Sequence, residues 1–131
     1  MHINSSGENY LETILILSKK RPVVRSVDIA TELDFKKPSV SVAMKKLRTS
    51  GHITVSPEGY INLTESGKEI ATQIYEKHQF FTRQLIEAGV PQDIAAQDAC
   101  RLEHVISETS FQKLKEAAFS GSREVIPSDE S

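Results

Sequence analysis

Apolar residues in the first half of the chain recur at helical spacing in three segments. This spacing predicts helices over residues 5–18, 27–33 and 38–50, the second capped by Ser26 and the third opened by Pro38. The inward positions share an i, i+3, i+4, i+7 pattern, and they are Tyr10, Ile14, Leu17, Ile29, Ala30, Leu33, Val40, Ala43, Met44 and Leu47.

The hydrophobic period then changes from that of a helix to that of a strand. Apolar and polar residues alternate over 53–55 and again over 61–63, and a Pro-Glu-Gly sequence at 57–59 separates the two runs. Two short alternating runs around such a turn predict a β-hairpin. Residues 1–64 therefore have the element order of a winged helix-turn-helix, in which the third helix enters the DNA major groove and the hairpin forms the wing.

Three longer helical patterns follow the hairpin. The first is capped by Thr64 and ends near Gly89, the second opens at Pro91, and the third runs from a cap at Ser107 to Gly121. Their apolar stripe is wider than one small domain can cover, which predicts a homodimer. The residues of this stripe are Ile70, Ile74, Phe81, Leu85, Phe111 and Leu114.

The predicted fold class is mainly α. A winged helix-turn-helix domain over residues 1–64 is followed by a helical dimerisation domain over residues 65–121. The last ten residues, 122–131, are polar and predict a disordered tail.

Charge is distributed unevenly along the chain, although the net charge is only −2. Residues 1–64 carry nine basic and six acidic side chains, a balance of +3, whereas residues 65–131 have a balance of −5. A basic surface on the third helix predicts contact with double-stranded DNA, although a solvated basic face is the plainer alternative. The candidate DNA-binding residues are Lys36, Lys37, Ser39, Ser41, Val42, Lys45, Lys46 and Arg48.

Composition argues against other classes of protein. The longest apolar run, residues 14–17, is far too short to span a membrane, and the N-terminus lacks the features of a secretion signal. With a single cysteine in 131 residues, the chain is expected in the reducing cytoplasm. No P-loop, HExxH or catalytic-triad pattern is present, so neither an enzymatic activity nor a small-molecule substrate is expected.

A candidate metal site lies near the end of the fifth helix. Cys100, Glu103 and His104 stand at i, i+3 and i+4, so a helix brings a thiol, a carboxylate and an imidazole to one face. Such residues also occur without a metal, since a lone cysteine is more often a small buried hydrophobe. The three residues alone leave both interpretations open.

The chain resembles the metal-dependent repressors that include the diphtheria toxin repressor and the manganese transport regulator. The resemblance covers about residues 8–114. It rests on four segments: 8–14 (Glu-Asn-Tyr-Leu-Glu-Thr-Ile), 36–41 (Lys-Lys-Pro-Ser-Val-Ser), 76–78 (Glu-Lys-His) and 99–107 (Ala-Cys-Arg-Leu-Glu-His-Val-Ile-Ser). It implies a metal-activated DNA-binding dimer without the SH3-like third domain of the toxin-repressor branch.

The resemblance also implies a set of metal ligands. Cys100, Glu103 and His104 match the toxin-repressor branch, His78 matches both branches, and Glu12 matches the manganese branch, in which a glutamate replaces the cysteine. Asn9 occupies a further ligand position, where the branches have methionine or aspartate. Thr82 and Ala96 replace two ligands of an ancillary site in the toxin-repressor branch, so that site is not expected to be complete.

The sequence therefore predicts a cytoplasmic, homodimeric repressor of metal-homeostasis genes that binds a palindromic operator when it holds a divalent metal. Fe(II) is favoured over Mn(II) because Cys100 supplies a thiolate, and Co(II), Ni(II) or Zn(II) are expected to activate in vitro. Three alternatives remain: a manganese-responsive member of the same family, a metal-independent regulator with Cys100 as a redox sensor, and a small metalloenzyme.

Overall fold

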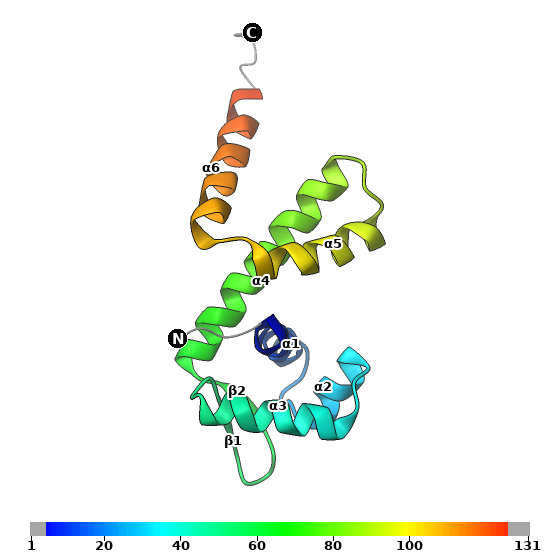
Figure 1. The fold of residues 1–131 in the computed structure, drawn as a ribbon, viewed down its shortest axis with the longest axis vertical. Coiled ribbons are helices and arrows are strands. Elements are labelled where there is room, and N and C mark those ends of the chain that lie inside the picture. The colour runs from blue at the N-terminus through cyan, green and yellow to red at the C-terminus, as the bar shows by residue number, and fades with distance from the viewer. Residues whose placement is uncertain (1–4, 126–131) are drawn as a thin grey trace. The chain divides into compact units, whose positions relative to one another are not determined.

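A computed structural model describes residues 5–125 (Figure 1). The elements in chain order are α1 (Ser5–Lys20), α2 (Ser26–Leu33), α3 (Lys37–Thr49), β1 (Ile53–Val55), β2 (Ile61–Leu63), α4 (Glu65–Glu87), α5 (Gln92–Val105) and α6 (Glu108–Val125). The chain forms two compact units that divide between Glu76 and Lys77, within the long helix α4. Within residues 5–125, no helix is long and apolar enough to cross a membrane.

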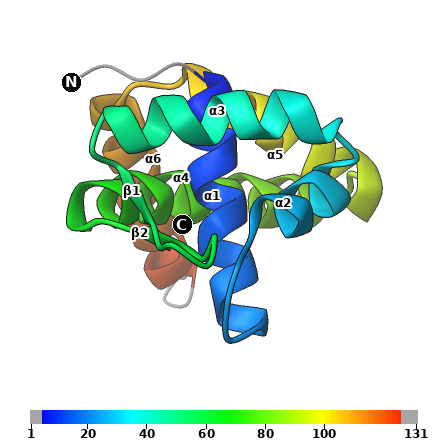
Figure 2. The same cartoon turned by 90° about the horizontal axis from the view of Figure 1, so that it is seen from below.

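The first unit is a winged helix-turn-helix built around α1, which packs against α2, α3 and β2 (Figure 2). The predicted inward positions of the first three helices form its core, together with both strands of the hairpin. The buried members of this core include Tyr10, Leu11, Ile14, Leu17, Ile29, Ala30, Val40, Met44, Leu47, Ile53 and Ile61.

The hairpin is antiparallel and confirms the predicted strands. Ile53 lies opposite Leu63 and Val55 opposite Ile61. The hairpin is also attached to the segment before α2, because the Ile61 N–H donates a 2.7 Å hydrogen bond to the Val24 carbonyl. The base of the wing is thereby held against the start of the helix-turn-helix.

The starts of α2 and α3 differ from the sequence prediction by one residue, as does that of α5, where Pro91 is the N-cap and Gln92 the first helical residue. Arg25, not Ser26, caps α2: its backbone N–H donates a 2.9 Å hydrogen bond to Asp28 Oδ2, which makes Ser26 the first helical residue. Pro38 is the second residue of α3, because Lys37 already has helical geometry after an extended Lys36. Ser26 and Pro38 fit within the first turn, because the amide groups of the first turn have no hydrogen-bond partner within the helix and a proline there loses no helical hydrogen bond.

The junction between α3, β1 and α4 is closely packed. Thr64 caps α4 as predicted, with its Oγ1 3.2 Å from the Gly67 nitrogen, and its own N–H donates to the His52 carbonyl at 3.0 Å. His52 is buried, with Nδ1 3.0 Å from Ser66 Oγ. His52, directly before β1, is therefore part of the packed junction and does not face solvent on the wing.

Gly67 is required by this packing, because a Cβ atom there would lie 2.0 Å from the His52 carbonyl oxygen. We expect Gly67→Ala to lower the free energy of unfolding by about 1–3 kcal/mol, since the backbone of His52 must move. Urea unfolding measures this effect. Lys68→Ala, at the next and exposed position of α4, is the control and is expected to stay within about 0.5 kcal/mol of the wild type. Equal stability of the two variants would contradict the packing argument.

The second unit contains the last part of α4 together with α5 and α6. Its small core consists of Phe81, Ala99 and Phe111, with Phe80 packed edge-on to Phe81 and Phe111. Ser107 caps α6 as predicted, because its Oγ accepts a 3.0 Å hydrogen bond from the backbone of Ser110.

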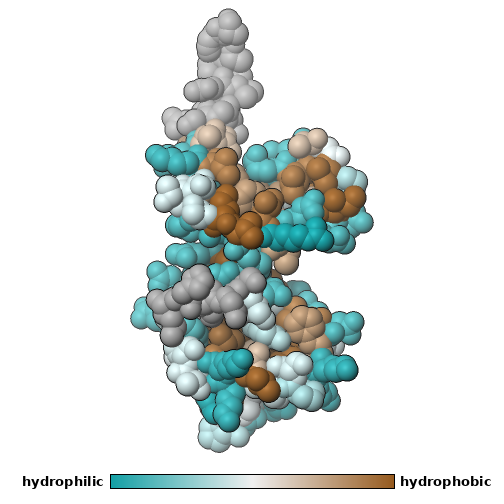
Figure 3. Space-filling view, viewed as in Figure 1, coloured by the Kyte–Doolittle hydropathy of each residue, from teal (hydrophilic) through white to brown (hydrophobic). Residues whose placement is uncertain are grey.

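The apolar surface of the second unit differs from the predicted stripe. Phe81 and Phe111 are buried in the core, whereas other side chains face solvent on α4, α5 and α6. The exposed apolar residues are Ile86, Ile94, Leu102, Val105, Leu114 and Phe119. Apolar side chains are visible on one face of this unit in Figure 3.

Helix α6 continues beyond its predicted end at Gly121. It extends to Val125, so the first four residues of the predicted tail are helical, and residues 126–131 of that tail lie outside the described part of the chain. A glycine in a helix interior costs only about 1 kcal/mol relative to alanine, and the Arg123 and Glu124 that follow are good helix formers.

Candidate functional site

The candidate metal ligands of α5 lie together on one face of the helix. Each of Cys100, Glu103 and His104 offers a ligand atom, and these three atoms lie within 4.8 Å of one another. Glu103 is only 1% exposed, while Cys100 and His104 are partly buried. Helical spacing accounts for the shared face.

His78 joins this group from α4. Its Nδ1 lies 2.9 Å from Glu103 Oε1, and His104 Nε2 lies 3.3 Å from Glu103 Oε2. A buried carboxylate is therefore placed between imidazoles from two helices. We refer to His78, Cys100, Glu103 and His104 as the α4–α5 ligand cluster.

The environment of Glu103 suits a cation. Its Oε2 is buried and makes no hydrogen bond within the described residues, although His104 Nε2 lies 3.3 Å away, and such a position is costly for a carboxylate. Zinc-type ions hold N, O and S ligands at about 2.0–2.3 Å, so ligands on opposite sides of one ion are up to about 4.6 Å apart. The 4.8 Å limit on the α5 trio is close to this value. Thiolate and imidazole ligands favour a transition metal over Mg²⁺ or Ca²⁺.

The remaining predicted ligands belong to the first unit. Asn9 and Glu12 lie three residues apart on α1, where Glu12 is buried at 6% exposure and Asn9 is partly buried. Thr82 and Ala96, expected to leave an ancillary site incomplete, are partly buried in the second unit, and Thr82 Oγ1 makes no hydrogen bond within residues 5–125.

Lys77, next to His78, is a buried cation that was not among the residues predicted from the sequence. Its Nζ lies 3.4 Å from Glu108 Oε1 and 5.8 Å from the centre of the Phe111 ring, so it joins α4 to α6. A hydrogen bond from Gln112 and the nearby charge of Lys77 hold the pKa of Glu108 below its usual value. A signal was present in the sequence, since Lys77 occupies a core-facing position between apolar residues of α4.

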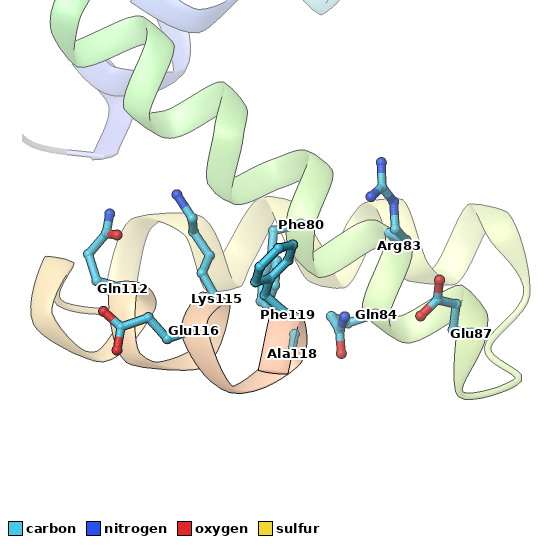
Figure 4. A pocket seen from close by; sticks show the side chains of 9 residues that line it. All are labelled: Phe80, Arg83, Gln84, Glu87, Gln112, Lys115, Glu116, Ala118 and Phe119. Atoms are coloured by element: carbon cyan, nitrogen blue, oxygen red, sulfur yellow. The ribbon is translucent and has the colours of Figure 1, made fainter. Parts of the chain in front are cut away.

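The second unit also has a groove that is separate from the ligand cluster. It is a groove of about 450 Å³ between α4 and α6 (Figure 4). Its lining combines the aromatic rings of Phe80 and Phe119 with charged side chains, among them Arg83, Lys115 and Glu116. None of the four cluster residues lines it.

The candidate DNA-binding residues lie on the solvent side of α3 and on the turn before it. All eight are exposed, and Val42 is 57% exposed although it is apolar. Val40, Met44 and Leu47 occupy the opposite, buried face of the same helix. The helix therefore presents hydroxyl, methyl and basic groups outward, a combination suited to base edges and phosphates.

We expect variants of α3 to separate two kinds of DNA contact. Ser39→Ala or Val42→Ala should change sequence preference, by about 1–3 kcal/mol for a lost base contact. Lys45→Ala or Lys46→Ala should weaken binding to all sequences and reduce its salt dependence. Binding of operator and mixed-sequence DNA at several salt concentrations measures both effects. Equal losses on both DNAs for all four variants would contradict the assignment.

Comparison with known protein families covers nearly the whole chain. Residues 2–60 match the model described as the iron dependent repressor, N-terminal DNA binding domain, and residues 64–120 match its metal binding and dimerisation domain. The chain is 34% identical to an uncharacterized HTH-type transcriptional regulator of Methanocaldococcus jannaschii, over 86% of this chain and 92% of the relative.

Two further relatives are about equally similar to this chain. Identity is 32% to the transcriptional regulator MntR of Escherichia coli, over 82% of this chain and 70% of the relative. Identity is also 32% to the iron-dependent repressor IdeR of Mycobacterium tuberculosis, over 82% of this chain but 47% of that longer protein.

Among solved structures, the manganese regulator SloR aligns with a TM-score of 0.77 at 26% identity, over 90% of this chain and 54% of SloR. Members of this family bind DNA and dimerise, and they are transcriptional repressors, not enzymes, so the metalloenzyme alternative is not retained. This chain belongs to the iron-dependent repressor family, which includes IdeR and MntR, and is a metal-dependent transcriptional regulator.

Proposed function

We propose that this protein is a repressor of metal-homeostasis genes that responds to Fe(II) through the α4–α5 ligand cluster. The observation that carries this proposal is the cysteine within the cluster. Cys100 places a sulfur ligand beside Glu103 and His104, with their ligand atoms no more than 4.8 Å apart. Manganese prefers oxygen ligands, whereas thiolate and imidazole move selectivity towards Fe(II) and later metals.

Each side chain of the cluster has a distinct role in this proposal. Cys100 sets the preference for a softer ion, and Glu103 supplies the negative charge at the buried centre. His78 and His104 hold the carboxylate from two helices, at 2.9 and 3.3 Å from its oxygens. A bound divalent ion supplies positive charge to this centre and satisfies the buried carboxylate.

Asn9 and Glu12 are included as ligands on the strength of the resemblance. Metal binding in this proposal favours the DNA-binding form of the protein. DNA affinity then depends on metal, because a ligand shifts an equilibrium by its differential affinity for the two states. We propose that the active form is a cytoplasmic homodimer on a palindromic operator, with one α3 in each of two successive major grooves.

A manganese-responsive regulator is the second candidate. It is favoured by the match of Glu12 and His78 to the manganese branch and by the similarity to MntR and SloR. The two candidates differ in the effect expected of Cys100, since a thiolate is a poor ligand for Mn(II).

The test is a gel shift on DNA from upstream of the protein's own gene, first with chelator and then with each divalent metal under anaerobic conditions. We expect no retarded complex with chelator. With metal, we expect the complex to form at a lower free concentration of Fe(II) than of Mn(II). A complex that forms equally with chelator, but is lost on oxidation, would replace the proposal with a metal-independent redox sensor acting through Cys100.

A further inference from the structure

The wing of this protein lacks basic side chains. Residues 52–64, which include both strands and the turn, contain no lysine or arginine, and their single charged side chain is Glu58 at the turn. A wing that approaches the DNA backbone needs positive charge, because phosphate contacts supply most of the affinity. Residues 52–64 supply no lysine or arginine for such a contact.

Arg25 lies against the base of the wing. Its guanidinium carbon is 4.9 Å from the centre of the Tyr60 ring, and its Nη2 is 3.3 Å from the Tyr60 hydroxyl. The backbone is held as well, because the Arg25 N–H is bonded to Asp28 and the adjacent Val24 carbonyl accepts from Ile61 of β2. The guanidinium is thus oriented by a planar ring on which arginine stacks well.

The charge of Arg25 is not cancelled by a neighbouring acid. Asp28, the nearest carboxylate in sequence, pairs through its side chain with Arg21. Within the described residues, no salt bridge to a carboxylate is formed by the Arg25 guanidinium, which is exposed. An exposed, oriented and uncompensated guanidinium is suited to a phosphate group.

The start of α2 and the wing lie on the same side of the first unit as α3. Figure 2 views this side, with α3 running across it and the hairpin meeting the segment that leads into α2. A winged helix-turn-helix that places α3 in the major groove brings the helix before it close to the flanking backbone. Arg25, at the N-terminus of that preceding helix, is then placed to meet a backbone phosphate.

We propose that Arg25, held by Tyr60, is a DNA phosphate contact and supplies the positive charge that the wing lacks. This inference rests on the proposed function, since it assumes that α3 reads DNA. The contact is independent of base sequence, because it is made to the backbone. It adds affinity and fixes the docking angle of the wing without specifying the operator.

The test measures binding to mixed-sequence double-stranded DNA by fluorescence anisotropy at several salt concentrations, with the metal-loaded full-length protein. Arg25→Ala should lower affinity about tenfold and reduce the slope of log affinity against log salt by about 0.9 per bound subunit. Arg25→Lys should retain the slope but lower affinity by less, because it keeps the charge and loses the planar stacking. Tyr60→Ala should behave as Arg25→Lys does.

Lys113→Ala is the matched control, since it removes one exposed positive charge from α6 of the second unit. It should leave both affinity and salt slope unchanged. Thermal melting of each variant reports whether the fold is intact. If Arg25→Ala melts at a lower temperature than the wild type, the Arg25→Lys and Tyr60→Ala variants still test the proposal. A wild-type salt slope in Arg25→Ala, or a Tyr60→Ala that binds as tightly as the wild type, would overturn the proposal. A wild-type protein that binds no DNA in any metal state would instead overturn the proposed function.

Discussion

Glu103→Gln is expected to abolish the metal response while retaining the size and shape of the side chain. It removes the negative charge from the buried centre of the cluster, where the carboxylate contacts His78 at 2.9 Å and its second oxygen has no hydrogen bond within residues 5–125. Loss of even an outer partner of a metal ligand costs about 10–100-fold in affinity, so loss of this charge should exceed about 100-fold.

Anaerobic titration with Co(II), followed by absorption, measures the effect directly. Asp98→Asn is the matched control, because Asp98 is a carboxylate of the same helix that pairs with Arg101 at 3.1 Å and lies outside the ligand cluster. The control should bind Co(II) as the wild type does. A Glu103→Gln variant that also binds Co(II) like the wild type would show that Glu103 is not a metal ligand.

Exchanging Cys100 is expected to change which metal activates the protein. Cys100→Glu replaces the sulfur with a carboxylate, as in the manganese branch, and should move the response towards Mn(II) because manganese prefers oxygen ligands. Cys100→Ala removes a ligand without a substitute and should lower affinity for every metal. Operator binding as a function of free metal measures both effects.

Cys100→Ser is the control for this exchange, since it retains the side-chain size and replaces only the sulfur. It should lose Fe(II) affinity without the gain in Mn(II) response expected of the glutamate variant. If Cys100→Ala binds Fe(II) as tightly as the wild type, the thiol is not a ligand, and the choice of iron over manganese has no support.

Much of the fold could be predicted because its signals are local. The change from helical to alternating spacing located both strands of the hairpin at the residues that form them, 53–55 and 61–63. The hydroxyl caps at Thr64 and Ser107 are hydrogen-bonded as expected. The predicted end of the last helix at Gly121 was wrong, because a single glycine among good helix formers does not end a helix. The burial of Phe111 was missed because spacing identifies an apolar face without saying what covers it.

The candidate metal site also has a part that local spacing predicts and a part that it does not. The proximity of Cys100, Glu103 and His104 follows from helix geometry alone. The contact between His78 and Glu103 joins residues 25 positions apart, so only the family resemblance placed His78 with them. The stacking of Arg25 on Tyr60 spans 35 positions and depends on how the wing packs against the start of α2, for which no local pattern exists.

The metal dependence of operator binding tests the central claim most directly. The wild-type protein is titrated anaerobically on its operator with buffered Fe(II), with buffered Mn(II), and with chelator alone. We predict no specific binding with chelator, and binding at a lower free concentration of Fe(II) than of Mn(II). Binding that is as tight with chelator as with metal would contradict metal activation, and a response to Mn(II) at the lower concentration would contradict the assignment of iron.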